Sequence, residues 1–281
     1  MITFHKILAG CKAGDRDAWR SFLAEYSPVV YQLMGVSLVW TPEKSQEFWR
    51  EALRTLSTGD FERLRAFSHH SEREFLVDLR ATLLELAIHQ IDPSQDAKHP
   101  PGPTLDTLGA MLKGLPLVHQ EIVFLALAGY SQATLEKMLR ITPSVAQSAF
   151  ERLGADYAPV LERVGDHCLW PAAWLEITRA ARAAKNQDCT PLRPLIRILD
   201  GQGSWYDKSP VEEHRSSCLH CLELWTSLLE VACWKREAKP WPAQEVEPLL
   251  DALPLAAAQP GKRSFMARVF GGRKSEVGSR K

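Results

Sequence analysis

The sequence predicts an all-α protein, on two observations. Apolar residues recur at helical spacing through most of the chain, and alternating strand patterns bounded by turn residues are nearly absent. A chain of 281 residues is long enough for two or three domains. With 45% hydrophobic and 24% charged residues, its composition is that of a globular protein and excludes wholesale disorder.

Two proline-rich segments separate three compact units. We predict a helical domain over 1–90, a proline-rich linker over 91–103, a second helical domain over 104–164, a third over 165–238, and a proline-rich segment with a basic tail over 239–281.

No membrane or secretion signal is evident. No apolar run approaches the roughly 18–20 residues of a membrane helix, and the N-terminus lacks a signal-peptide core. We therefore expect a cytoplasmic protein. Its six cysteines are then expected to be free, metal-bound or redox-active rather than paired in structural disulfides.

The net charge of zero conceals an uneven distribution. Residues 260–281 carry seven basic side chains and one acid, whereas the rest of the chain is slightly acidic. The neutral total therefore does not exclude nucleic acid as a partner of the whole chain. The tail could contact anionic lipid, RNA or DNA phosphate, or it could be a solvated disordered segment.

The first unit has clear helix-start signals. Asp15 can cap a helix whose buried stripe is Trp19, Phe22, Leu23 and Tyr26. Thr41 before Pro42 predicts a second start, and Ser71 with Glu74 predicts a capping box for a third helix.

The second unit has the pattern of a helix-turn-helix. Ser131 is placed to cap one short helix, and Thr142 before Pro143 is placed to start the next. Two short helices joined by a few residues and preceded by a supporting helix form the DNA-reading motif. An ordinary helical hairpin would give the same pattern.

Together these two units resemble a known family. The stretch from Ile7 to Met34 resembles the start of the core-binding region of extracytoplasmic-function sigma factors, and Leu105 to Leu153 resembles their promoter −35 reading region. The resemblance implies a protein that binds RNA polymerase core and promoter DNA. It places the DNA contacts at Ser131, Arg140, Ser144, Gln147, Ser148 and Arg152.

The sequence departs from the family where DNA should be held. The helix from Phe75 to Gln90, which matches the −10 reading helix, has Arg80 as its only full positive charge. The second reading helix presents Ser, Gln and Glu where the family has Lys or Arg. Phosphate contacts supply much of DNA affinity, so we expect weak DNA binding or a changed role.

The third unit contains a metal-ligand pattern. His214, Cys218 and Cys221 are spaced i, i+4 and i+7, which on one helix would place three soft ligands on one face. Cys189 lies upstream, and the turn at 200–203 can bring it back as a fourth ligand. The pattern predicts a zinc site, and it resembles the zinc-binding anti-sigma domain. The alternative is that these residues face a helical core.

The other candidate ligands are excluded by position. His220 lies between two ligand cysteines and is expected to point elsewhere, and Cys168 and Cys233 read as small buried residues. No phosphate-binding glycine loop or H-E-x-x-H motif is present, and a closed four-ligand site leaves no open position for catalysis. We therefore do not expect an enzyme.

Two functions remain. The first is a divergent sigma-type transcription factor modulated by a fused zinc-binding domain, with a regulatory protein as a further partner. The second is a protein-interaction or anti-sigma-type regulator that uses a degenerate sigma fold and a zinc module without reading DNA.

Overall fold

The computed structural model describes residues 3–66, 69–98, 102–153 and 167–255, and every regular element in these ranges is helical. The predicted all-α class is confirmed. The helices are α1 (Phe4–Lys12), α2 (Arg16–Ser37), α3 (Pro42–Ala66), α4 (Glu72–Ala87), the 3-10 helix η1 (Pro93–Lys98), α5 (Leu105–Leu112), α6 (Leu117–Leu127), α7 (Gln132–Leu139), α8 (Pro143–Glu151), α10 (Pro171–Ala183), α11 (Leu192–Leu199), α12 (Trp205–Ser217), α13 (Leu219–Glu237) and α14 (Ala243–Leu250).

The predicted caps of α2 and α4 are present. An Asp15 carboxylate oxygen accepts the backbone N–H groups of Asp17 and Ala18 at 2.8 and 3.0 Å and so caps α2. The hydroxyl of Ser71 accepts the Glu74 N–H at the start of α4. The return bond of this box differs from the prediction, because the Glu74 carboxylate accepts the N–H of His70 and not that of Ser71.

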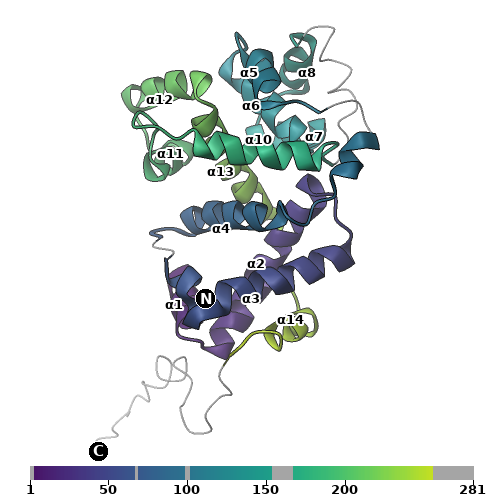
Figure 1. Cartoon of the computed structure of the whole chain (residues 1–281). Coiled ribbons are helices and arrows are strands. Elements are labelled where there is room, and N and C mark those ends of the chain that lie inside the picture. The colour runs from purple at the N-terminus through teal and green to yellow at the C-terminus, as the bar shows by residue number, and fades with distance from the viewer. Residues whose placement is uncertain (1–2, 67–68, 99–101, 154–166, 256–281) are drawn as a thin grey trace, which may run out of the picture.

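The helices form two halves joined by α13 (Figure 1). Helices α1 to α4 lie in the lower half of this view, and α5 to α8 lie beside α10 to α12 in the upper half. Helix α13 passes between the halves. It packs against α2 and α4 below, and against α6, α7 and α10 to α12 above.

One hydrophobic core runs through all of these parts. The stripe Trp19, Phe22, Leu23 and Tyr26 is buried as predicted, with exposures of 0 to 1%. The same cluster continues through Phe124 of α6 and Trp174 of α10, whose rings meet edge to face at 4.6 Å, to Leu228 of α13. The third unit is therefore built into the core between the other two.

Both proline-rich segments contain ordered helix. Asp96 in η1 accepts the backbone N–H groups of Ala172 and Ala173, so the first linker caps α10 from outside. In the second, the structure adds α14 after Pro242, which can precede a helix because no N–H is needed there. Its residues Val246, Leu249 and Leu250 are fully buried, and α14 packs against α2.

The turn between α6 and α7 requires a glycine. Gly129 has φ of +107°, and a Cβ there would lie 2.3 Å from the backbone nitrogen of Cys168. That nitrogen donates a hydrogen bond to the Val36 carbonyl at 2.9 Å. Three distant parts of the chain therefore meet at one glycine.

Among the described residues, no helix combines the length and apolar character needed to cross a bilayer.

Candidate metal centre

The three ligands that are close in sequence come from the end of α12, the start of α13 and the residue between these helices. We predicted that His214, Cys218 and Cys221 share one helix, and this is wrong. Helix α12 ends at Ser217 and α13 begins at Leu219, with Cys218 between them in an extended conformation (φ −117°, ψ 109°). The break turns the chain so that His214, in the last turn of α12, and Cys221, in the first turn of α13, face the same point.

The fourth ligand comes from the loop between α10 and α11. Asn186 and Cys189 form a tight turn, in which the Asn186 backbone N–H donates to the Cys189 Sγ at 3.3 Å. The Asn186 side-chain oxygen in turn accepts the N–H of Asp188 at 2.9 Å. This local network holds the Cys189 sulfur toward the α12–α13 break.

The four ligand atoms converge. Those of Cys189, His214, Cys218 and Cys221 all lie within 4.8 Å of one another, and the sulfurs of Cys189 and Cys218 are 3.7 Å apart. All four cysteine and histidine side chains are buried or half-buried. The His214 Nε2 atom is buried without a hydrogen-bond partner, as expected of a nitrogen whose partner is a metal ion. This cluster could therefore hold a metal ion.

The thiol of Cys221 depends on such an ion for ionisation. Burial raises the pKa of Cys221 to about 12, and the neighbouring sulfurs of Cys218 and Cys189 add to the increase. A cation would reverse this balance, because a metal-bound thiol loses its proton. Metal binding at this cluster is therefore expected to release protons.

The cluster is tied to α6 by the residues that follow His214. Arg215 forms a buried ion pair with Glu121 at 2.9 Å, and its guanidinium lies 3.9 Å from the centre of the Trp225 ring. The side-chain amide of Gln120 donates to the carbonyl of Ser216 at 3.1 Å. Burial raises the pKa of Glu121 to about 7, although Arg215 acts in the opposite direction.

The remaining cysteines and His220 lie outside the cluster. The Nδ1 atom of His220 is 3.2 Å from the Arg182 carbonyl oxygen, so this ring points away from the ligands as predicted. Cys168 and Cys233 are buried, also as predicted, and so is Cys11.

The residues predicted to contact DNA lie on the α7–α8 pair. Arg140 forms the turn between these helices in the left-handed conformation (φ 55°), and Arg140, Ser144, Gln147 and Arg152 are exposed. Ser131 and Ser148 are half-buried. Ser131 occupies the first position before α7 but makes no cap; its hydroxyl lies 3.1 Å from that of Thr134.

The exposed side of α8 has little positive charge. The Gln147 amide donates to the Glu151 carboxylate at 2.9 Å, so an acid lies beside the candidate reading residues.

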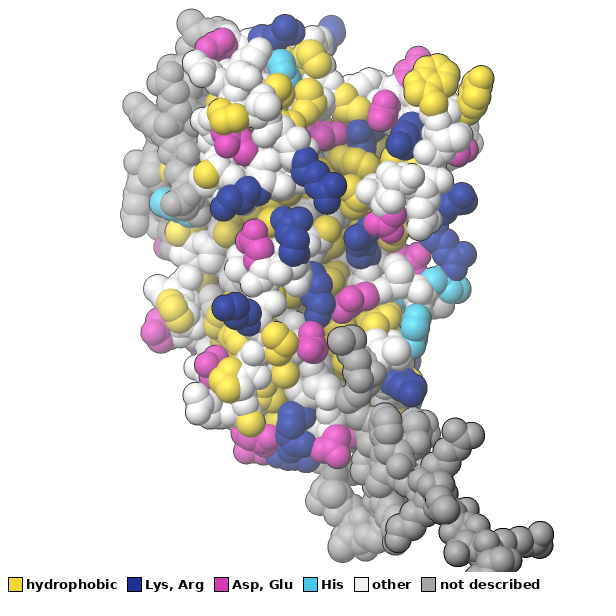
Figure 2. All heavy atoms as spheres, turned by 180° about the vertical axis from the view of Figure 1, so that it is seen from behind, with side chains coloured by type: hydrophobic (Ala, Val, Ile, Leu, Met, Phe, Trp, Pro, Cys, Tyr) yellow, Lys and Arg dark blue, Asp and Glu magenta, His cyan; other side chains and the backbone are white. Residues whose placement is uncertain are grey.

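On the opposite side of the molecule from Figure 1, Lys and Arg side chains gather along the middle of the face with Asp and Glu among them (Figure 2).

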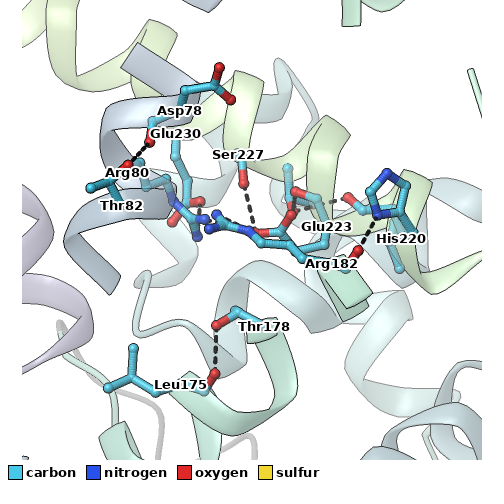
Figure 3. A network of polar contacts seen from close by, with 12 residues as sticks. Asp78, Arg80, Thr82, Leu175, Thr178, Arg182, His220, Glu223, Ser227 and Glu230 are labelled. Atoms are coloured by element: carbon cyan, nitrogen blue, oxygen red, sulfur yellow. Dashed lines mark hydrogen bonds and ion pairs between the residues drawn. The ribbon is translucent and has the colours of Figure 1, made fainter. Parts of the chain in front are cut away.

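Sequence reasoning missed a buried ionic network on α13 (Figure 3). Arg80 of α4 is 2% exposed and pairs with Glu223 at 2.8 Å and Glu230 at 2.7 Å. Glu223 also accepts from Arg182 of α10 and from Ser227, and Glu230 accepts the Tyr130 hydroxyl. The only signal in the sequence was that two acids seven residues apart lie among the apolar residues of the middle of this helix.

The network balances two acids against two cations. Burial alone would raise the pKa of Glu223, but Arg182 and Arg80 outweigh it and lower the value. For Glu230 burial prevails over Arg80 and raises the pKa. The network joins α4, α10, α13 and the turn before α7, so it fixes the relative positions of all three units.

Comparison of the chain with protein-family models, with curated proteins and with solved structures found no match to any of them.

Proposed function

We propose that this protein is a divergent sigma-type transcription factor that binds RNA polymerase core and promoter DNA, and that its zinc-binding third unit holds it in a closed arrangement. The observation that carries the proposal is the burial of Arg80. Of the arginines on α4, the helix expected to read the −10 element, Arg80 is the buried one, and it is paired with Glu223 and Glu230 of α13.

The donor set supports zinc as the ion. One imidazole and three thiolates are the ligands of structural zinc sites, which are four-coordinate and closed. Tetrahedral zinc with bonds of about 2.3 Å to sulfur separates two sulfurs by roughly 3.8 Å. The distance between the sulfurs of Cys189 and Cys218 is 3.7 Å, so this pair already has the required spacing. The chain's residues thus fit the ion without rearrangement of this pair.

The closed arrangement has a physical consequence for DNA binding. Arg80 cannot reach a phosphate while α13 covers it, because its side chain is 2% exposed and already paired. Opening this closed arrangement would require α13 to separate from α4, and Glu223 and Glu230 would then lose their ion pairs with Arg80. The ionic network is therefore expected to set the free energy needed to separate the two helices.

The test is promoter-dependent transcription by the full-length protein. We expect wild type to bind polymerase core weakly, and the double variant Glu223→Gln/Glu230→Gln, used where circular dichroism shows that it is folded, to bind more tightly and to give more run-off transcript. The matched control is Glu176→Gln, which removes an acid from an exposed pair with Arg179 on α10. Absence of both core binding and transcript from wild type and the double variant would refute the sigma-type proposal.

A second candidate is a regulator that binds other proteins and does not read DNA. The observation that favours it is the exposed face of α8, which has little positive charge and carries the Glu151 carboxylate beside Gln147. Core binding without promoter-dependent transcript, unchanged by the opening variant, would support this candidate over the first.

A further inference from the structure

A cleft of about 320 Å³ lies beside the metal centre. One wall comes from the end of α5 and the start of α6, and the other from the break between α12 and α13. Its lining includes Lys113, Arg215, Ser217 and Gln120 but no Asp or Glu among the described residues. The cleft therefore combines two cations with polar groups, and its one lining group that would carry a negative charge is Cys218, as a metal-bound thiolate.

The N-terminus of α13 opens at this cleft. Cys218 precedes the helix and lines the cleft, yet its side chain makes no cap bond, since its sulfur belongs to the metal cluster. A helix of this length leaves its first N–H groups without intrahelical partners and carries partial positive charge at that end. Such an uncapped end favours an anion.

Arg215 provides the second, independent observation. The residue is 4% exposed, and its Nη2 atom is engaged by Glu121. Its Nε atom is buried and has no hydrogen-bond partner. A buried guanidinium nitrogen without a partner costs free energy. Arg215 lines the cleft, so an acceptor that reached this nitrogen from the cleft would recover that free energy. Glu121 pairs with the Nη2 atom of this guanidinium and leaves the Nε atom without a partner.

The opposite wall of the cleft contains an exposed lysine and a stretch of backbone that a ligand can reach. Lys113 follows α5 and is exposed, and the next residue, Gly114, has φ of +80° with no atom within 4 Å of the place where a Cβ would be. A ligand can approach the backbone closely there. Leu112, Leu219 and Leu222 add an apolar surface to the cleft.

We propose that this cleft binds a small organic anion, with a carboxylate or phosphate group held by Arg215, Lys113 and the α13 N-terminus, and a short apolar portion on the leucines. Because the two cations belong to different units, an occupied cleft ties the second unit to the metal module. The site is thus placed to couple a small-molecule signal to the separation of these units. Its occupancy is independent of polymerase and DNA.

Three probes test the site on the metal-loaded full-length protein: inorganic phosphate, octanoate and octanol. Binding is followed by calorimetry and by the ¹⁵N–¹H signal of the Arg215 Nε–H group. We expect saturable binding of phosphate or octanoate with a shift of this signal, and no such shift with octanol. Phosphate alone would identify a phosphate site, and octanoate alone a carboxylate site that needs the apolar portion.

Two variants make the outcome decisive. Lys113→Gln, at an exposed position, should weaken binding about tenfold, the effect of removing one charge-assisted hydrogen bond. Arg215→Lys keeps the charge but removes the Nε–H group, and should also weaken binding. The control is Lys137→Gln, an exposed lysine on α7 that does not line the cleft. Binding that is equal in Lys113→Gln and the control, or equal for octanoate and octanol, would overturn the proposal.

Discussion

Arg80 and Glu223 form an ion pair at 2.8 Å in which each side chain is 2% exposed, although they lie 143 positions apart in the chain. Two desolvated charges at this depth are tolerated because each has further partners: Arg80 also pairs with Glu230, and Glu223 with Arg182. The pair therefore joins α4 to α13 specifically, at the point where the first and third units meet.

Removing the Glu223 carboxylate should destabilise the protein strongly. Glu223→Ala leaves Arg80 and Arg182 without their shared acceptor, and breaking a buried pair in this way costs about 3–5 kcal/mol. Chemical denaturation of wild type and variant measures the difference. Glu176→Ala, in an exposed pair, is the control and should change the free energy of unfolding by less than about 1 kcal/mol. Similar small effects at both positions would show that the network does not hold the fold.

Removal of the metal should unfold the third unit. Exhaustive chelation is expected to release about one zinc ion per chain and to lower helix content and protease resistance over residues 186–235, because the ion links the α10–α11 loop to the α12–α13 break. Cys218→Ser should show the same loss and bind little zinc. Cys233→Ser, at a buried cysteine outside the cluster, should retain the metal. Unchanged circular dichroism and proteolysis after chelation would contradict the zinc assignment.

Glu121 should make stability depend on pH. Burial raises its pKa to about 7 from the ordinary value of 4.5 for a glutamate side chain, so folding favours the protonated form. That contribution is fully present below about pH 4.5 and is lost as the pH rises through about 7. Unfolding free energies measured between pH 5 and 8 should therefore fall more steeply in wild type than in Glu121→Gln. Glu85→Gln, at an exposed position on α4, is the control and should keep the wild-type dependence of unfolding free energy on pH. If Glu121→Gln also keeps that dependence, the Glu121 carboxyl is not its cause.

Gly129→Ala should lower the free energy of unfolding more than most substitutions that add a single methyl group to the chain. Its Cβ would overlap the Cys168 backbone at 2.3 Å, and the backbone at φ +107° disfavours any side chain. We expect a loss of several kcal/mol in denaturant unfolding. Gly35→Ala in α2 meets no atom within 4 Å and should instead stabilise by about 0.5–1 kcal/mol. Equal effects of the two changes on the free energy of unfolding would indicate that the turn at Gly129 adjusts to a side chain without strain.

Much of the local structure was predictable because its causes are local. The Asp15 cap, the buried stripe that follows it and the paired short helices α7 and α8 depend on residues within a few positions of one another. The helix break at Cys218 was not predictable in this way. Nothing in 212–221 requires the helix to stop, and at the turn the Cys218 sulfur lies 3.7 Å from that of Cys189, 29 positions away.

Residue types and their spacing determined the all-α class, most helix starts and the identity of the four candidate ligands, since side-chain chemistry and helical period act over short distances. Tertiary structure alone decided that α13 lies between the other units, that Arg80 is buried against it, and that α14 returns to α2. These outcomes depend on which distant surfaces bury each other best. That is a property of the whole core, and no local pattern encodes it.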